Sequence, residues 1–362
     1  MEHANPLLKE NHNSHKFITI GEIMLRLTPP NYEKIRMASG FEASYGGSEA
    51  NIALALANLG IDSTFFTAVP NNSLGKSAVR LLRSNDVHCT PVILTTPEET
   101  PSHRLGTYYL ETGYGIRASK VIYDRKHSAI TEYDFSSYDF DNLLEGFTWL
   151  HLSGITPALG ENCREMILKC LKTAKEKGLT VSFDGNFRST LWTWEEAREF
   201  CTKCLPYVDV LFGIEPYHLW KEEGDYSKGD WKDGLPLQPD FMQQDEVFWK
   251  FVERYPNLKC IARHVRYAHN GSENSLKAYM WYQGHTYESK LFTFNILDRV
   301  GGGDAFASGL IYAMMKGNKP MDMVNFAVAS SALKHTIRGD ANITDDAAAI
   351  QNLMNMNYDI KR

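Results

Sequence analysis

Apolar runs of strand length alternate with helically spaced apolar residues along most of the chain. Strand-like runs occur at 17–27, 63–69, 148–152, 179–184 and 208–212, and helical patterns occur at 50–59, 74–82, 161–175 and from Trp194 onward. Repeated strand and helix units of this kind are typical of a parallel sheet covered by helices. We therefore predict an α/β fold with a mostly parallel central sheet flanked by helices.

Two stretches depart from this alternation. Residues 101–130 alternate apolar with polar positions, are rich in Thr, Tyr, Val and Ile, and contain no helical pattern. We interpret them as a β hairpin, which should protrude because it has no helix of its own with which to join a βαβ layer. Residues 220–246 mix Gly, Pro and both charges without periodicity, so we expect a surface insertion there.

A glycine-rich turn near the C-terminal end carries the strongest chemical signal. The apolar run 291–297 is soon followed by Gly301, Gly302 and Gly303, after which helical spacing begins at once. The unpaired amides and positive dipole of such a helix N-terminus form a ready anion site. Asp304 stands beside them, where a carboxylate could accept a proton from an alcohol while the amides stabilise a transferring phosphoryl group. The alternative is that Asp304 only caps the helix and the glycines only form the turn.

A second loop imitates a nucleotide-binding motif. Residues 70–77, Pro-Asn-Asn-Ser-Leu-Gly-Lys-Ser, match a Walker A loop at a strand-to-helix junction except at the first position. That position matters, because Pro70 fixes φ and removes a backbone donor where the loop needs a glycine. A P-loop nucleotide-binding protein that uses Lys76 is therefore an alternative rather than our main hypothesis.

The overall composition indicates a globular protein whose ligand site is local. Hydrophobic residues make up 43% of the chain, which is ample for a sizeable core. A formal net charge of −6 argues against a nucleic-acid partner. No apolar run approaches the ~20 residues that span a bilayer, and the first fifteen residues are polar rather than a signal peptide. We therefore expect a cytoplasmic protein without a membrane partner.

Two segments of the chain resemble signatures of one enzyme family. Residues 298–306, Asp-Arg-Val-Gly-Gly-Gly-Asp-Ala-Phe, resemble the second signature of the PfkB, or ribokinase-like, sugar kinases. The first signature, Gly-Gly-x-x-x-Asn-x-Ala followed by a later Gly, is matched by Gly46, Gly47, Asn51, Ala53 and Gly60. Two distant signatures in the right order are far more specific than either alone. Arg299 replaces the usual Thr, and this variant is similar to the form in 2-keto-3-deoxygluconate kinases.

The resemblance implies a fold and an activity. The fold would be one ribokinase-like kinase domain over residues 1–362, with a small β lid from about 28–45 and 101–130. The activity would be ATP-dependent phosphorylation, with Mg²⁺, of the terminal hydroxyl of 2-keto-3-deoxygluconate to give 2-keto-3-deoxy-6-phosphogluconate. Asp304 would take the proton, and the amides that begin at Gly301 would stabilise the γ-phosphoryl group. Family members often pair, so we expect a homo-oligomer.

The same resemblance assigns further residues by their place in family motifs. For the sugar it implies Gly47, Asn51, Tyr109, Tyr123, Arg125, Arg188 and Asp340, with Arg188 as the main clamp for a carboxylate and Arg117 as a further candidate. For the nucleotide it implies Asn186, Arg188, Arg266, Gly301 and Gly303. A sugar acid is favoured as the substrate, since a neutral sugar would leave these cations unpaired at a cost.

Metal binding is where the chain departs from the family pattern. The Asn-x-x-Glu that organises magnesium and phosphates should fall at 214–217, but Ile214 and Tyr217 occupy its ends and only Glu215 could substitute. No metal ligand is therefore assigned. Three alternatives stay open: a fructokinase or other neutral-sugar kinase of this family, an inactive sugar-sensing relative, and the P-loop protein. The sequence does not distinguish the gluconate substrate from its galactonate epimer.

Overall fold

A nine-stranded sheet forms the centre of the protein. The computed structural model describes residues 15–214, 217 and 240–356. The sheet strands within these ranges are β1 (Lys16–Ile20), β4 (Asp62–Phe66), β9 (Trp149–Ser153), β10 (Thr180–Asp184), β11 (Val210–Phe212), β12 (Cys260–Ala268), β13 (Glu273–Tyr282), β14 (His285–Glu288) and β15 (Phe292–Asn295). Their order is β14-β13-β12-β11-β10-β9-β1-β4, and β15 pairs with β13. The pairs from β4 to β12 are parallel, which confirms the predicted sheet, whereas β13 to β15 form an antiparallel edge.

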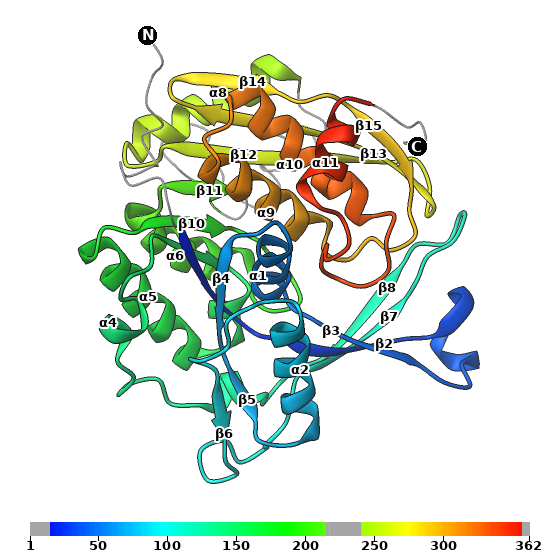
Figure 1. Ribbon diagram of the computed structural model, residues 1–362, viewed down its shortest axis with the longest axis vertical. Helices are drawn as coiled ribbons and strands as arrows, with labels where there is room; N and C mark the ends of the chain where they lie inside the picture. The colour runs from blue at the N-terminus through cyan, green and yellow to red at the C-terminus, as the bar shows by residue number, and fades with distance from the viewer. Residues whose placement is uncertain (1–14, 215–216, 218–239, 357–362) are drawn as a thin grey trace.

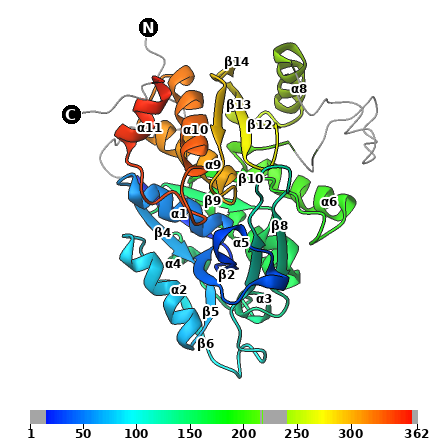
Figure 2. The same cartoon turned by 90° about the vertical axis from the view of Figure 1, so that its right-hand side faces the viewer.

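Helices cover both faces of this sheet (Figures 1 and 2). One face carries α1 (Ser48–Asn58), α9 (Gly302–Met315), α10 (Pro320–Lys334) and α11 (Ala347–Met354), and the other carries α4 (Phe140–Leu143), α5 (Glu161–Glu176), α6 (Trp194–Cys204) and α8 (Phe241–Arg254). The remaining helices of the described residues are α2 (Ser73–Ser84), α3 (Ala129–Glu132) and the 3-10 turns at Pro30–Tyr32, Ile35–Met37, Thr156–Leu159 and Leu205–Tyr207. Within the described ranges, no helix combines the length and the apolarity that a bilayer crossing requires.

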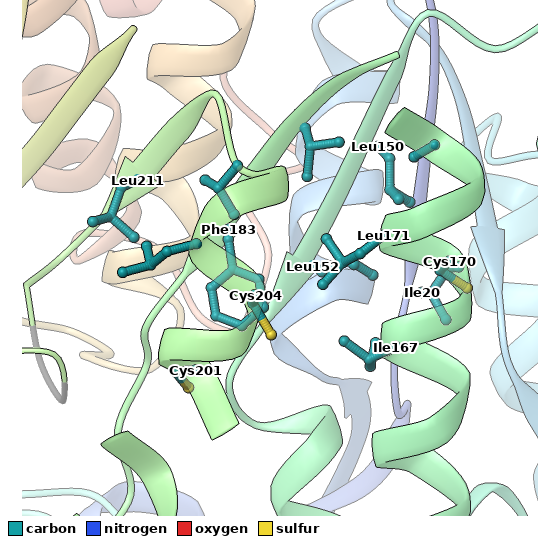
Figure 3. Close-up of a cluster of buried hydrophobic side chains, with 14 of the residues drawn as sticks. Ile20, Leu150, Leu152, Ile167, Cys170, Leu171, Phe183, Cys201, Cys204 and Leu211 are labelled. Atoms are coloured by element: carbon teal, nitrogen blue, oxygen red, sulfur yellow. The ribbon is translucent and has the colours of Figure 1, made fainter. Parts of the chain in front are cut away.

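The alternation of side chains along each strand explains why both faces are covered. Leu152, Phe183 and Leu211 point to the face that α5 and α6 cover, where they pack in one buried cluster (Figure 3). Their neighbours in sequence point to the opposite face, and Phe212 packs there against Phe306 of α9. Successive residues of a strand face opposite sides of a sheet, so strands that are apolar at every position must be buried on both sides.

A second, smaller sheet extends away from these layers (Figure 1). Its strands are β2 (Met24–Thr28), β3 (Glu42–Gly46), β7 (Thr107–Glu111) and β8 (Lys120–Asp124), in the order β3-β2-β7-β8. We call it the lid sheet. The segment predicted to form a hairpin supplies the antiparallel pair β7 and β8. A separate parallel pair, β5 (Ala68–Pro70) with β6 (Ile93–Thr95), lies outside both sheets.

The structure refines the sequence prediction at two boundaries. The strand-like run at 17–27, which Gly21 interrupts, divides between β1 of the central sheet and β2 of the lid sheet. The insertion predicted at 220–246 extends too far, because α8 begins at Phe241 behind a capping box formed by Asp240 and Gln243. The part of that insertion from 220 to 239 lies outside the described residues.

Candidate active site

Two helix N-termini meet at the edge of the central sheet where the parallel strands end. Helices α1 and α9 pack against each other, and each begins at a glycine, Gly47 and Gly301. A cavity of about 530 Å³ opens over both N-termini and is also lined by Asp184 at the end of β10. Ligands of open α/β sheets collect at this carboxyl edge, and two converging positive helix ends suit an anionic ligand.

Asp304 lines this cavity from the first turn of α9. Ser48 Oγ donates a hydrogen bond to Asp304 Oδ1 at 2.7 Å, and Asn51 Nδ2 donates to Oδ2 at 2.7 Å. Burial raises the pKa of Asp304, while the hydrogen bonds from Asn51 and Ser48 partly offset that shift. The residue at the N-cap of α9 is Gly301, which has no side chain. The alternative in which Asp304 only caps its helix is therefore wrong.

The three glycines before Asp304 have different reasons to be glycine. Gly301 has a left-handed φ of 78°, and a Cβ there would overlap the carbonyl oxygen of Asp340. A Cβ on Gly302 would overlap the imidazole of His335. A Cβ on Gly303 would contact only His264, at 3.7 Å, and otherwise meets open space in the cavity. Gly301 and Gly302 thus permit close packing, and Gly303 keeps the approach to the helix N-terminus open.

A chain of polar contacts links Asp304 to the end of β10. It passes through Ser48, which the sequence analysis missed. Asn186 Nδ2 donates to Ser48 Oγ at 3.0 Å, and the Asn186 backbone N–H donates to Asp184 Oδ1 at 2.9 Å. Burial, followed by the negative charge of Asp304, raises the pKa of Asp184 to about 7. Ser48 could have been found from its spacing, since it lies three residues before Asn51 on one helical face.

Three arginines line the cavity without a carboxylate partner among the described residues: Arg188, Arg266 and Arg299. Burial lowers the pKa of Arg299, and burial together with repulsion from Arg299 and Arg188 lowers that of Arg266. Arg188 and Arg266 are exposed and Arg299 is half-buried, and neighbouring like charges cost free energy unless an anion neutralises them. This cluster therefore points to a polyanionic ligand over the glycine turn.

Arg125 also reaches the cavity, but its charge is already matched. It forms a buried ion pair with Glu22, to which its Nε donates at 2.8 Å, and Ser128 Oγ donates to the other oxygen of Glu22 at 2.5 Å. Tyr123 lines the cavity beside it, with the Arg125 guanidinium 5.4 Å from the centre of its ring. The structure thus brings both predicted residues to the site and gives Arg125 an internal partner.

Two predicted lid residues do not reach the cavity. Tyr109 packs edge-on against Phe41, with ring centres 5.9 Å apart, and its neighbour Tyr108 lines the cavity instead. Adjacent residues of a strand point to opposite faces, so the pairing of β7 in the lid sheet turns Tyr108 toward the cavity and Tyr109 away from it. Arg117 donates to the backbone carbonyl of Tyr32 in the lid region and is absent from the cavity lining. Both residues were predicted near the substrate, and this arrangement does not support that prediction.

Asp340 lies at the edge of the cavity with both carboxylate oxygens engaged. Arg26 Nη1 donates to Oδ1 at 2.6 Å, and the hydroxyl of Tyr108 donates to Oδ2. The side chain is buried, and its carboxylate lies against Gly46, where a Cβ would overlap it. A substrate hydroxyl predicted to bind here would have to compete with these two donors.

The positions where the family has Asn-x-x-Glu belong to the core in this protein. Ile214 and Tyr217 are buried, and the ring of Tyr217 meets Phe251 edge-on at 6.2 Å. Neither side chain offers a carboxylate to a metal, and Glu215 lies outside the described residues. No described group of three His, Cys, Asp or Glu side chains has a geometry that would hold a metal ion.

The loop that imitates a P-loop is not built to hold phosphate. The side chain of Asn72 accepts hydrogen bonds from the backbone N–H groups of Leu74 at 3.0 Å and Gly75 at 3.1 Å, so it caps α2. These are the amides that a phosphate would need. Lys76 does not line the cavity that contains Asp304. The alternative based on Lys76 therefore has no support in the structure.

The layered parallel sheet, the four-stranded lid sheet and a carboxylate at the start of a helix beside unpaired arginines together define the class of ribokinase-like sugar kinases. The chain belongs to the pfkB family of carbohydrate kinases, whose family model matches residues 14–216. This membership confirms the resemblance seen in the two signatures.

Individual relatives cover nearly the whole chain. It is 32% identical to the 2-dehydro-3-deoxygalactonokinase of Haloferax volcanii over 91% of this chain and 94% of that protein. It is also similar to the crystal structure of 2-dehydro-3-deoxygluconokinase from Thermotoga maritima, with a TM-score of 0.84, 36% identity, and coverage of 94% and 99% of the two chains. An uncharacterized sugar kinase from Pyrococcus horikoshii, solved in complex with ATP, shares the fold, with a TM-score of 0.64, 18% identity, and coverage of 89% and 93%.

Proposed function

We propose that this protein is an ATP-dependent kinase that phosphorylates the terminal hydroxyl of 2-keto-3-deoxygluconate to give 2-keto-3-deoxy-6-phosphogluconate. The observation that carries the proposal is Asp304, held by Ser48 and Asn51 beside the open Gly303 turn. The relatives named 2-dehydro-3-deoxygluconokinase and 2-dehydro-3-deoxygalactonokinase support this substrate class, since 2-dehydro denotes the same keto group.

Asp304 acts as the proton acceptor for the sugar hydroxyl. Burial raises its pKa, which makes the carboxylate a better base than an exposed one, and the two donors keep it in a fixed orientation. Phosphoryl transfer has a loose transition state in which the proton can leave late. Positioning of the hydroxyl therefore contributes more to the rate than the strength of the base.

The phosphates of ATP lie over the N-terminus of α9, where the backbone N–H groups beginning at Gly303 face the cavity. Arg188, Arg266 and Arg299 supply positive charge from three different segments. A polyphosphate would relieve their mutual repulsion, so these residues would stabilise the complex with ATP.

The donors in the cavity fit a magnesium ion bound together with phosphates. Such an ion usually takes one or two carboxylates and completes its shell with phosphate oxygens and water. Asp184 faces the cavity next to Asp304 and is the carboxylate best placed for this purpose. When bound, the ion would neutralise charge on the phosphates.

The carboxylate of the sugar acid is bound by Arg188, which lines the cavity and, among the described residues, hydrogen-bonds to the Phe187 carbonyl but pairs with no carboxylate. Tyr123 and Asn51 offer polar groups to the sugar chain from the lid sheet and from α1. A neutral sugar is the second candidate, because the pairing of Arg125 with Glu22 leaves one cation fewer for a substrate carboxylate.

A coupled assay that follows ADP formation tests the proposal on four sugars: 2-keto-3-deoxygluconate, its galactonate epimer, fructose and ribose. We expect kcat/KM to be highest for one or both of the keto-deoxy acids. Arg188→Met should raise KM for these acids more than for a neutral sugar, because it removes the partner of the carboxylate. Turnover of the neutral sugars alone would refute the sugar-acid assignment.

A further inference from the structure

Arg26 is a buried arginine that does not itself line the substrate cavity, although its partner Asp340 lies at the edge of that cavity. It stands in the middle of lid strand β2, is only 4% exposed, and is absent from the lining of the cavity that contains Asp304. Its Nη1 donates to Asp340 at 2.6 Å, its Nη2 to Asp298 at 2.5 Å, and its Nε to Thr28 Oγ1 at 2.9 Å. All three guanidinium nitrogens are therefore in use.

Both carboxylates that Arg26 binds hold the glycine turn in place. Asp298 accepts hydrogen bonds from the backbone N–H groups of Val300 and Gly339, each at 3.1 Å, so it fixes the start of the turn. Asp340 packs its carbonyl oxygen against Gly301 and its carboxylate against Gly46. It therefore separates the two glycine turns that begin α9 and α1.

The lid sheet also contacts the glycine turn through Tyr108 and a small apolar cluster. Tyr108 of β7 donates to Asp340, and Met24, Tyr108 and Leu110 of the lid sheet pack with Val300 in a small apolar cluster. Beneath the turn, the fully buried Lys334 donates to the carbonyl oxygen of Asp298 at 3.4 Å. Buried ion pairs with this many contacts allow few alternative arrangements, so the positions of the lid sheet and the turn are coupled.

We propose that Arg26 is a positioning residue for phosphoryl transfer, which locks the lid sheet to the turn carrying Gly303 and Asp304. The inference rests on the proposed kinase function and extends it to a residue that touches neither substrate. Loss of the Arg26 guanidinium should displace Asp304 and the N-terminus of α9 relative to the sugar hydroxyl that the lid sheet helps to hold. The side chains that contact ATP and the sugar would still be present. A displacement of about 1 Å can cost a reaction on the order of 10²-fold.

Arg26→Lys is the variant to test, because lysine keeps the charge but cannot bind two carboxylates and a hydroxyl in one plane. We expect kcat to fall roughly 10- to 100-fold, with KM for ATP and for the sugar each changed by less than about threefold. ATP hydrolysis without sugar should rise relative to sugar phosphorylation, since a lid that is not held admits water. Arg104→Lys is the matched control, because Arg104 pairs with Asp124 at 2.8 Å on the lid without contacting the turn, and its kinetics should stay near wild type.

Tyr108→Phe provides an independent variant that leaves every charge in place and is expected to fold even if the lysine variant does not. It should change kcat in the same direction by a smaller factor. Unchanged kcat in both variants, with only the melting temperature lowered, would overturn the proposal, and so would a rise in KM at constant kcat. All variants are assayed with whichever sugar the wild type phosphorylates best, so the proposed substrate can fail while the role of Arg26 is still tested.

Discussion

At the scale of single residues, two hydrogen bonds orient the Asp304 carboxylate, and no ion pair among the described residues neutralises its charge. Ser48 and Asn51 each donate to one of its oxygens, and no described cation forms an ion pair with it. Arg188 favours the charged form through its field, but burial outweighs this and raises the pKa. A carboxylate that is oriented, ionisable and unpaired is suited to accept a proton.

Replacing Asp304 with Asn tests this role directly. We expect kcat to fall roughly 10²-fold or more, because an amide cannot take the proton. The melting temperature should stay near that of the wild type, since the side chain keeps its size and loses no ion pair. Steady-state kinetics and thermal unfolding measure the two effects. Lys76→Ala is the surface control, and loss of activity in that variant but not in Asp304→Asn would contradict the assignment.

Contacts between distant residues explain which site residues the sequence could not reveal. The signatures led to Asp304, Asn51 and the glycines because these lie in short motifs. The partner of Arg125 is 103 positions away, however, and Asp298 is 272 positions from Arg26. Neither pairing leaves a local pattern in the chain. The choice of Tyr109 over Tyr108 failed for a related reason, since the face that a strand residue takes depends on how its strand pairs.

At the scale of elements, the turn before α9 combines two requirements. Its backbone must pass through a left-handed residue at Gly301 and then leave the helix N-terminus accessible at Gly303. Sequence patterns identified the strand, turn and helix here because each has a distinct signal. Between β1 and β2 the sequence offered only the interruption at Gly21, which did not reveal that the two halves join different sheets. A Cβ at Gly21 would overlap Glu49, which explains that glycine by packing alone.

Alanine substitutions at the two ends of the glycine turn should have different effects. Gly301→Ala forces an L side chain into a positive φ and against the carbonyl oxygen of Asp340, so the melting temperature and kcat should both fall. The strain alone is about 1–3 kcal/mol. Gly303→Ala meets no backbone and should leave the melting temperature nearly unchanged, but its methyl group projects into the cavity and should raise KM for ATP. Equal melting temperatures for the two variants would contradict this division of roles.

At the scale of the whole molecule, the lid sheet leaves an apolar edge uncovered. Among the residues that the structure describes, strand β8 pairs with β7 alone, and all five of its residues are exposed. Tyr123 and Val121 face the cavity, whereas Ile122 is 43% exposed and does not line it. Edge strands with exposed apolar side chains tend to pair with another chain. A second copy of this protein covering β8 would explain the edge and would also shield the cavity from solvent.

Light scattering after size-exclusion chromatography tests this arrangement. We expect the wild type to have a mass of two or more times 41.1 kDa, the mass of one chain. Ile122→Lys should shift it toward a single chain, because a charged side chain at a buried lid contact carries a large desolvation cost. Met321→Lys is the matched control, since Met321 is 45% exposed on α10, far along the chain from the lid. A wild type that elutes with the mass of one chain, or a mass that both variants change equally, would exclude the lid edge as the contact between subunits.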